Sequence, residues 1–141
     1  MAYLVGLLLA LLLFAIAAAV RLDRERAFYP TVLMTIALYY VLFGVIGGET
    51  RVLMIEVGVA SVFLLTAIAG FKWSAWLIVA GMAGHGLFDS VHGALYVDRG
   101  VPLWWPAFCG TFDITAALVL AALLLRRRGS GASDVGKAGR I

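Results

Sequence analysis

Five long apolar segments, separated by short polar ones, set the pattern of the chain. They are residues 3–20, 28–47, 52–70, 74–97 and 104–125. An α-helix rises 1.5 Å per residue, so about 20 apolar residues cross the roughly 30 Å hydrocarbon core of a membrane. Barrel strands are about half as long and alternate apolar with polar residues. The pattern therefore predicts an all-α transmembrane bundle of five helices, in which short connections make consecutive helices antiparallel neighbours.

The composition identifies lipid as the solvent of this bundle. Hydrophobic residues make up 64% of the chain and charged residues only 13%, which is more apolar side chain than a water-soluble domain can bury. After residue 128 the sequence turns to Gly, Ser and Ala with scattered charge, as is typical of disordered segments. We expect one transmembrane domain, residues 1–128, followed by a disordered cytoplasmic tail, residues 129–141.

Lysine and arginine are distributed unequally between the two sides of the predicted bundle. One side holds only Arg51 and Arg99, and the other holds Arg21, Arg24, Arg26, Lys72, Arg126, Arg127, Arg128, Lys137 and Arg140. Because cytoplasmic loops are rich in these residues, the N-terminus is predicted outside and the C-terminus in the cytoplasm. Basic clusters at span ends are a topology signal rather than a nucleic-acid patch. The expected partners are membrane lipids and a second copy of the chain or another membrane protein.

Five ionisable residues lie inside the predicted spans: Glu56, His85, Asp89, His92 and Asp113. Each costs at least about 2.5 kcal/mol in hydrocarbon, so each calls for a partner or a purpose. Three of them follow one another at i, i+4 and i+7 on the fourth span, which places them on one stripe of that helix. On the same span, Ala80 and Gly84 form a small-xxx-small step that predicts close approach of another helix.

These residues are also expected to lie at similar depth. Counted inward at 1.5 Å per residue, they and Tyr39 lie between about 8 and 18 Å from the outer ends of their spans. The spans differ in direction, yet the inner half of the membrane holds essentially no such residue. We therefore expect one polar site that opens toward the outer face, with Tyr39 placed to donate a hydrogen bond.

Metal binding is one chemistry that this site supports. Imidazole and carboxylate are ligands of zinc, iron and manganese, and pairs one helical turn apart chelate readily. His85 and His92 are about 10 Å apart along the helix axis, which disfavours one ion held by the whole stripe. A pair centred on Asp89 and completed by Asp113 or Glu56 is favoured instead. A divalent ion with an open position would activate water for hydrolysis of a membrane-embedded substrate.

Two other interpretations stay open. The same side chains have the composition of an intramembrane proton relay, although the inner half offers no continuation of the path. They are equally compatible with a structural role, in which Asp89 and Asp113 accept hydrogen bonds from histidine or Tyr39 and so lock the helices together. Cys109 is most simply a small buried apolar residue, with a ligand or redox role as the alternative. No catalytic residue is assigned.

Two neighbouring motifs carry a resemblance to a known family. The sequence GHGLFDSVHG, followed by PLWWPAFCGTFD, resembles a family of small bacterial membrane proteins of unknown function, in which an H-x3-D-x2-H stripe precedes a W-P-x-F-C-x3-D segment. The similarity covers about the last third of the spans. It implies a small multi-pass protein of the bacterial inner membrane and directs attention to His85, Asp89, His92, Cys109 and Asp113. It implies no activity.

Overall fold

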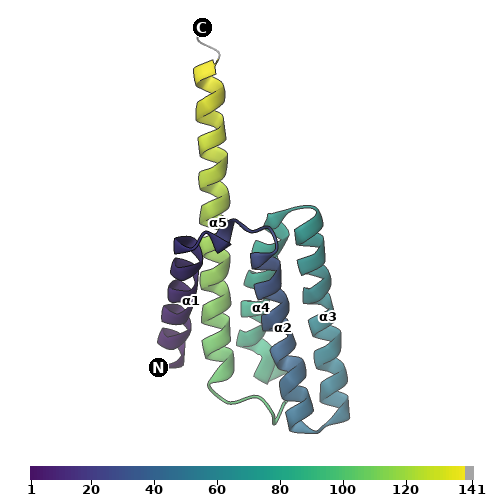
Figure 1. Cartoon of the computed structure of the whole chain (residues 1–141). Coiled ribbons are helices and arrows are strands. Elements are labelled where there is room, and N and C mark those ends of the chain that lie inside the picture. Colours follow the sequence, from purple (N-terminus) through teal and green to yellow (C-terminus); the bar gives the residue numbers. More distant parts are fainter. Residues whose placement is uncertain (139–141) are drawn as a thin grey trace.

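The protein is a bundle of five helices, and the computed structural model describes residues 1–138, with side chains up to residue 127. The elements in chain order are α1 (Ala2–Ala19), the short 3-10 helix η1 (Leu22–Arg24), α2 (Phe28–Gly47), α3 (Thr50–Lys72), α4 (Ala75–Leu95) and α5 (Trp105–Ala138). Figure 1 shows these helices side by side, and no strand occurs in the part of the chain that the structure describes. The predicted all-α bundle of five helices is confirmed.

Within the described residues, four helices are long and apolar enough to cross a membrane. They are α1, α2, α3 and the part of α5 from Trp105 to Arg127. This supports a multi-pass membrane protein. In α4, by contrast, His85, Asp89 and His92 interrupt the apolar sequence, and all three are buried inside the bundle. A crossing of the membrane by α4 as the fifth span stays a prediction.

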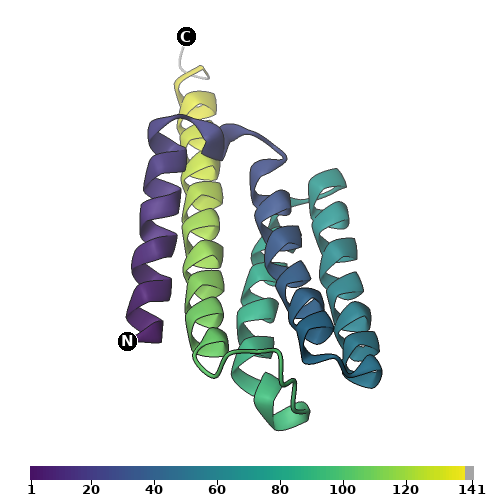
Figure 2. The same cartoon turned by 60° about the horizontal axis from the view of Figure 1, so that its bottom comes forward.

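Helix neighbours agree with the sequence prediction except at α1. The pairs α2 and α3, α3 and α4, and α4 and α5 pack against each other, as their short connections predict, whereas α1 packs along α5. Figures 1 and 2 show α1 at the outer edge of the bundle beside α5, with residues 20–27 crossing the end of the bundle to reach α2. Gly6 allows this contact, because a Cβ there would overlap the backbone of Phe108. Hydropathy predicts a span but not its neighbours.

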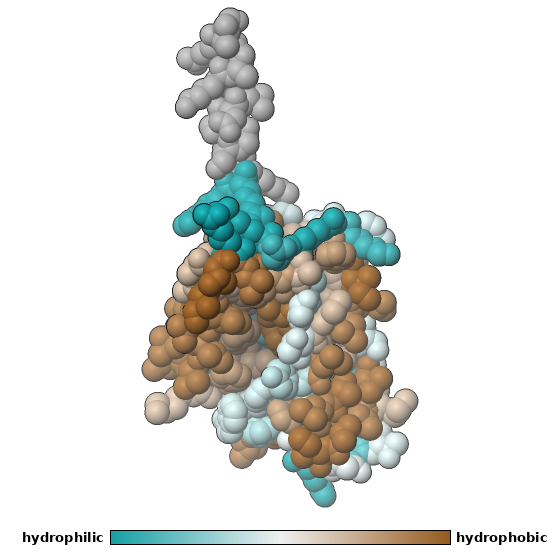
Figure 3. Space-filling view, in the orientation of Figure 1, coloured by the Kyte–Doolittle hydropathy of each residue, from teal (hydrophilic) through white to brown (hydrophobic). Residues whose placement is uncertain are grey.

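The outside of the bundle is apolar along its sides and charged at its ends, more strongly at one of them. Leu8, Leu42 and Leu65 are at least half exposed, and Figure 3 shows brown side chains along the helices with teal gathered where α5 leaves the bundle. This end, called here the basic end, carries η1 and the end of α3. Arg26 joins them by donating to the backbone oxygens of Phe71 and Lys72. An apolar girdle is the surface that lipid solvates.

The helix α5 continues beyond the apolar girdle. Its backbone is helical through Ala138, into the segment for which the composition predicts a disordered tail. Residues 139–141 lie outside the described residues. The division into a domain of residues 1–128 and a tail of residues 129–141 stays a prediction.

Candidate functional site

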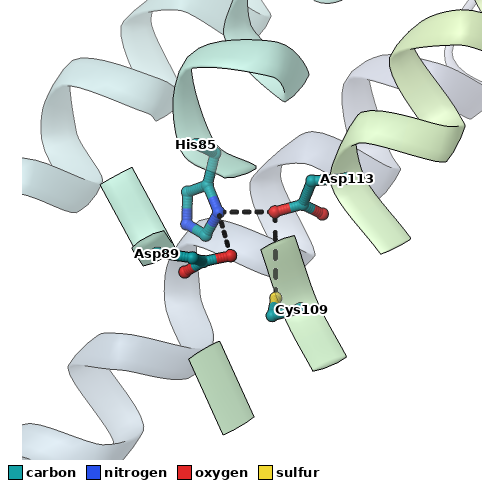
Figure 4. Close-up of side chains that lie close together, drawn as sticks. All are labelled: His85, Asp89, Cys109 and Asp113. Atoms are coloured by element: carbon teal, nitrogen blue, oxygen red, sulfur yellow. Dashed lines mark hydrogen bonds and ion pairs between the residues drawn. The ribbon is translucent and has the colours of Figure 1, made fainter. Parts of the chain in front are cut away.

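A cluster of four buried side chains lies where α4 faces α5. His85 and Asp89 come from successive turns of α4, and Cys109 and Asp113 from successive turns of α5. One donor atom from each of the four lies within 4.8 Å of the others, as Figure 4 shows. None of the four is more than 3% exposed. Residues four apart share one face of a helix, so two facing i, i+4 pairs are enough to build the cluster.

His85 is the centre of the cluster. Its Nδ1 lies 2.7 Å from Oδ2 of Asp113 and 3.7 Å from Oδ2 of Asp89. The thiol of Cys109 points at the same Asp113 oxygen, 3.8 Å away. The side chains therefore point inward at one small volume rather than at separate partners.

Two glycines allow α4 and α5 to approach closely enough for the four side chains to meet. A Cβ on Gly86 would lie 2.9 Å from the backbone oxygen of Gly110, and a Cβ on Gly110 would lie 3.3 Å from Cβ of Asp89. The sequence pattern predicts close packing at Ala80 and Gly84 instead, and this prediction is wrong. Both are exposed, and a Cβ on Gly84 would meet only a Phe63 ring carbon at 3.8 Å. The close approach occurs on a different face of α4.

Tyr40, not Tyr39, donates to the cluster. The Tyr40 hydroxyl lies 2.5 Å from Oδ1 of Asp89, and its side chain is 1% exposed. Tyr39 is 39% exposed, and its ring packs against Trp105 at 5.0 Å. Successive residues of a helix differ by about 100° in direction. The depth estimated from the sequence therefore identified the correct turn of α2 but not which of its residues faces the cluster. The hydrogen bond predicted for Tyr39 is therefore corrected to Tyr40.

Glu56 and His92 form a second group beside the cluster. His92 Nε2 lies 2.7 Å from Oε1 of Glu56, and both residues are at most 2% exposed. Tyr40 connects this pair to the cluster, because its ring centroid lies 4.5 Å from that of His92 while its hydroxyl reaches Asp89. The five ionisable residues thus meet in one buried region as two groups. Their assignment as metal ligands stays a prediction.

Tyr96 completes the second group, although the sequence patterns did not single it out. It follows the last residue of α4, and its ring lies 4.8 Å from that of His92. The Tyr96 hydroxyl is buried without a hydrogen-bond partner among the described residues. Tyr96 therefore adds an unused hydrogen-bond donor beside the Glu56–His92 pair. Tyr96 lies four residues after His92, and this spacing in the sequence indicates that the two side chains share one face of the helix.

The region has more buried acceptor atoms than partners for them. Oδ2 of Asp89, Oδ1 of Asp113 and Oε2 of Glu56 are buried without a hydrogen bond. The ion pairs of these three carboxyls, within residues 1–127, are to histidine alone. Buried charges are normally paired or bound to metal. With three carboxyls and two imidazoles, this group has spare negative charge to offer a cation.

No protein-family model, curated protein or solved structure matches the chain. Its function is therefore inferred from the chemistry and geometry of the buried residues.

Two cavities reach the four-residue cluster from different sides. An apolar groove of about 880 Å³ between α1, α2 and α5 ends on Cys109. A crevice of about 510 Å³ along α4 and α5 reaches Asp89, and Ser90, Thr111 and Thr115 make its lining more polar. The partly polar crevice at Asp89 thus suits water or a small cation, whereas the groove at Cys109 suits an apolar group.

Proposed function

We propose that the chain is a five-span protein of the bacterial inner membrane whose four-residue cluster binds one divalent transition-metal ion. His85, Asp89 and Asp113 would be the ligands. The observation that carries the proposal is the set of unpartnered carboxylate oxygens in a buried cluster that also holds an imidazole. Imidazole and carboxylate are the ligand types of zinc, iron and manganese sites.

Charge balance supports a divalent ion. Two carboxylates and a neutral imidazole around a divalent cation sum to zero, which is the charge that a membrane interior favours. The Glu56–His92 pair is separately neutral when the proton lies on histidine. A thiolate from Cys109 would leave one negative charge in excess, so its thiol is expected to stay protonated next to the ion.

The distances in the cluster are compatible with such an ion. Ligand atoms about 2.0–2.3 Å from a tetrahedral ion lie roughly 3.3–3.8 Å apart. Nδ1 of His85 lies 2.7 Å from Oδ2 of Asp113 and 3.7 Å from Oδ2 of Asp89, and all ligand atoms of the cluster lie within 4.8 Å of one another. Side-chain shifts of about one ångström or less are therefore sufficient. Tyr40 holds Asp89 by Oδ1, which leaves Oδ2 for the ion, and such outer partners commonly orient metal ligands.

Three protein ligands leave a fourth position for water, the arrangement of catalytic zinc sites. The crevice that reaches Asp89 would supply that water, and the groove that ends on Cys109 would admit an apolar substrate. Metal-dependent hydrolysis of a membrane-embedded substrate is therefore the reaction class that the site supports.

Elemental analysis of detergent-purified protein tests the metal proposal. We expect one equivalent of a divalent metal per chain, removed by a chelator and restored by Zn²⁺. The His85→Ala and Asp89→Ala variants should both purify without it, because three ligands are the minimum for tight binding in such sites. Wild-type protein that carries no metal and takes up none would contradict the proposal.

A structural role is the second candidate, and a specific observation favours it. Hydrogen bonds between His85 and Asp113, His92 and Glu56, and Tyr40 and Asp89 join α2, α3, α4 and α5. Such bonds between membrane helices are worth roughly 0.6 to 2 kcal/mol each. This candidate would be favoured if the wild-type protein binds no metal and the His85→Ala and Asp89→Ala variants lose thermal stability.

The orientation of the chain has its own test. The basic end contains Arg24, Arg26 and Lys72. At the other end lie Arg51, in the first turn of α3, and Arg99, in the connection between α4 and α5. The positive-inside rule then places the basic end in the cytoplasm and the cluster in the outer half of the membrane. Reporter fusions after Arg128 should behave as cytoplasmic and fusions next to Arg99 as external. The reverse pattern would overturn this orientation.

A further inference from the structure

A small polar pocket, called here the headgroup pocket, lies at the basic end of the bundle. Its volume is about 200 Å³, and segment 23–26, the start of α4 and the apolar end of α5 enclose it. Its charged lining has both signs: Arg24, Arg26 and Arg127 on one hand, Asp23 and Glu25 on the other. The headgroup pocket shares no residue with the buried cluster.

Tyr29 offers the pocket an unsatisfied hydrogen-bond donor. Tyr29 lines the pocket and is 6% exposed, and its hydroxyl is buried without a partner. The ring is fixed by stacking on Phe14, with centroids 5.6 Å apart. A buried hydroxyl without a hydrogen-bond partner is unfavourable, so a ligand with an acceptor oxygen would supply the missing hydrogen bond to Tyr29.

The start of α4 adds attraction for an anion. Ser74, the N-cap of α4, and Ala75 both line the pocket. The N–H groups of Trp76 and Leu77 are bound to Ser74, so the start of α4 contributes mainly the partial positive charge of a helix N-terminus. Arg24 and Arg127 add full charges. Arg26 is already engaged with the carbonyls that end α3, so it shapes the pocket rather than binding the ligand. Together these groups suit a phosphate.

The acidic residues define the other half of the ligand. Asp23 is only partly exposed, and both Asp23 and Arg127 lie close enough to act electrostatically on the Tyr29 phenol. A plain anion would be repelled by Asp23 and Glu25, whereas a ligand with an ammonium group next to its phosphate would satisfy both signs. Headgroups lie at the level where apolar spans meet basic residues.

We propose that this pocket binds the phosphoethanolamine headgroup of a membrane phospholipid. The phosphate lies against Arg127, Arg24, the Tyr29 hydroxyl and the start of α4, and the ammonium group lies against Asp23 and Glu25. The proposal does not depend on metal binding by the cluster.

Binding of short-chain phospholipids to delipidated wild-type protein tests the proposal. Native mass spectrometry would compare ethanolamine, choline and glycerol headgroups with inorganic phosphate alone. We expect the ethanolamine lipid to bind about fivefold more tightly than the other two lipids, because only its headgroup combines a positive charge with N–H donors. Choline has no N–H group, and the glycerol hydroxyls donate hydrogen bonds without a positive charge. Inorganic phosphate should bind weakly and should not displace it.

Single substitutions separate the two halves of the ligand. Arg127→Gln should weaken all three lipids about tenfold, and Tyr29→Phe, which removes only the hydroxyl, about threefold to tenfold. Asp23→Asn should abolish the preference for ethanolamine while leaving phosphate attraction in place. Arg51→Gln, at the opposite end of the bundle, is the matched control and should change nothing.

Three results would overturn the proposal. Tighter binding of the glycerol headgroup, unaffected by Asp23→Asn, would indicate a site for anionic lipid. Full competition by inorganic phosphate would indicate a site for the free ion. Equal binding of all headgroups, unchanged in Arg127→Gln and Tyr29→Phe, would mean that only the unspecific lipid shell is present.

Discussion

Asp113→Asn protein is expected to lose metal binding by at least 100-fold without losing the stability of the metal-free bundle. Asparagine keeps the shape of the side chain and an oxygen that can accept from His85, which now lies 2.7 Å from Oδ2 of Asp113. It removes the negative charge that a divalent ion requires. In the metal-free protein the same change keeps an acceptor for His85 and removes one negative charge from a buried region with more carboxyls than imidazoles, so stability should change little.

Thermal unfolding with and without added Zn²⁺ measures both effects. A ligand at 100 times its dissociation constant stabilises the folded state by about 2.7 kcal/mol, and a 100-fold loss of affinity should reduce this increment to about 0.4 kcal/mol or less in Asp113→Asn. Asp98→Asn is the matched control, because Asp98 is also a buried carboxylate but accepts from the backbone of Gly100 outside the cluster. Equal stabilisation by Zn²⁺ in wild type and Asp113→Asn would remove Asp113 from the ligand set.

Gly110→Ala is expected to damage the site by separating the helices that build it. The new Cβ would lie 3.1 Å from the backbone oxygen of Gly86 and 3.3 Å from Cβ of Asp89, so α4 and α5 must shift apart by a few tenths of an ångström. Overpacking of this kind costs about 1–3 kcal/mol. Because Asp89 and Asp113 come from the two helices that separate, the affinity for metal should fall at least tenfold along with stability.

The matched control is a glycine in open surroundings. A Cβ on Gly58, in the middle of α3, would have no atom within 4 Å, and replacing an exposed helix glycine with alanine is favourable by up to about 1 kcal/mol. Gly58→Ala should therefore keep both metal affinity and stability. Unfolding curves and Zn²⁺ titrations of the two variants check this, and a Gly110→Ala protein that behaves like Gly58→Ala would mean that the close approach of α4 and α5 is unnecessary.

The sequence predicted the helices and the polar residues well because both depend on the free energy of transfer into lipid. An apolar run of 18 residues, or an aspartate inside such a run, can be recognised in the sequence without knowing which helices pack against it. The helices α2 and α5 begin within one residue of the predicted spans. All five ionisable residues predicted to converge are buried together.

Features that depend on rotation about a helix axis could not be predicted in the same way. Tyr39 and Tyr40 differ by one position, and only the packing of α2 against its neighbours decides which of them faces Asp89. The same applies to Gly84 and Gly86 on α4. His92 shares a stripe with Asp89, yet it turns to Glu56 on α3. The contact of α1 with α5 is likewise a property of the assembled bundle.

X-ray absorption at the metal edge of the loaded protein tests the ligand set of the cluster most directly. We expect a first shell of nitrogen and oxygen at about 2.0–2.2 Å, with the scattering pattern of one imidazole, and no sulfur at about 2.3 Å. We also expect loss of the imidazole pattern in His85→Ala protein that is forced to bind the ion at high concentration. A sulfur shell, two imidazoles, or an ion surrounded by water alone would contradict a neutral site made by His85, Asp89 and Asp113.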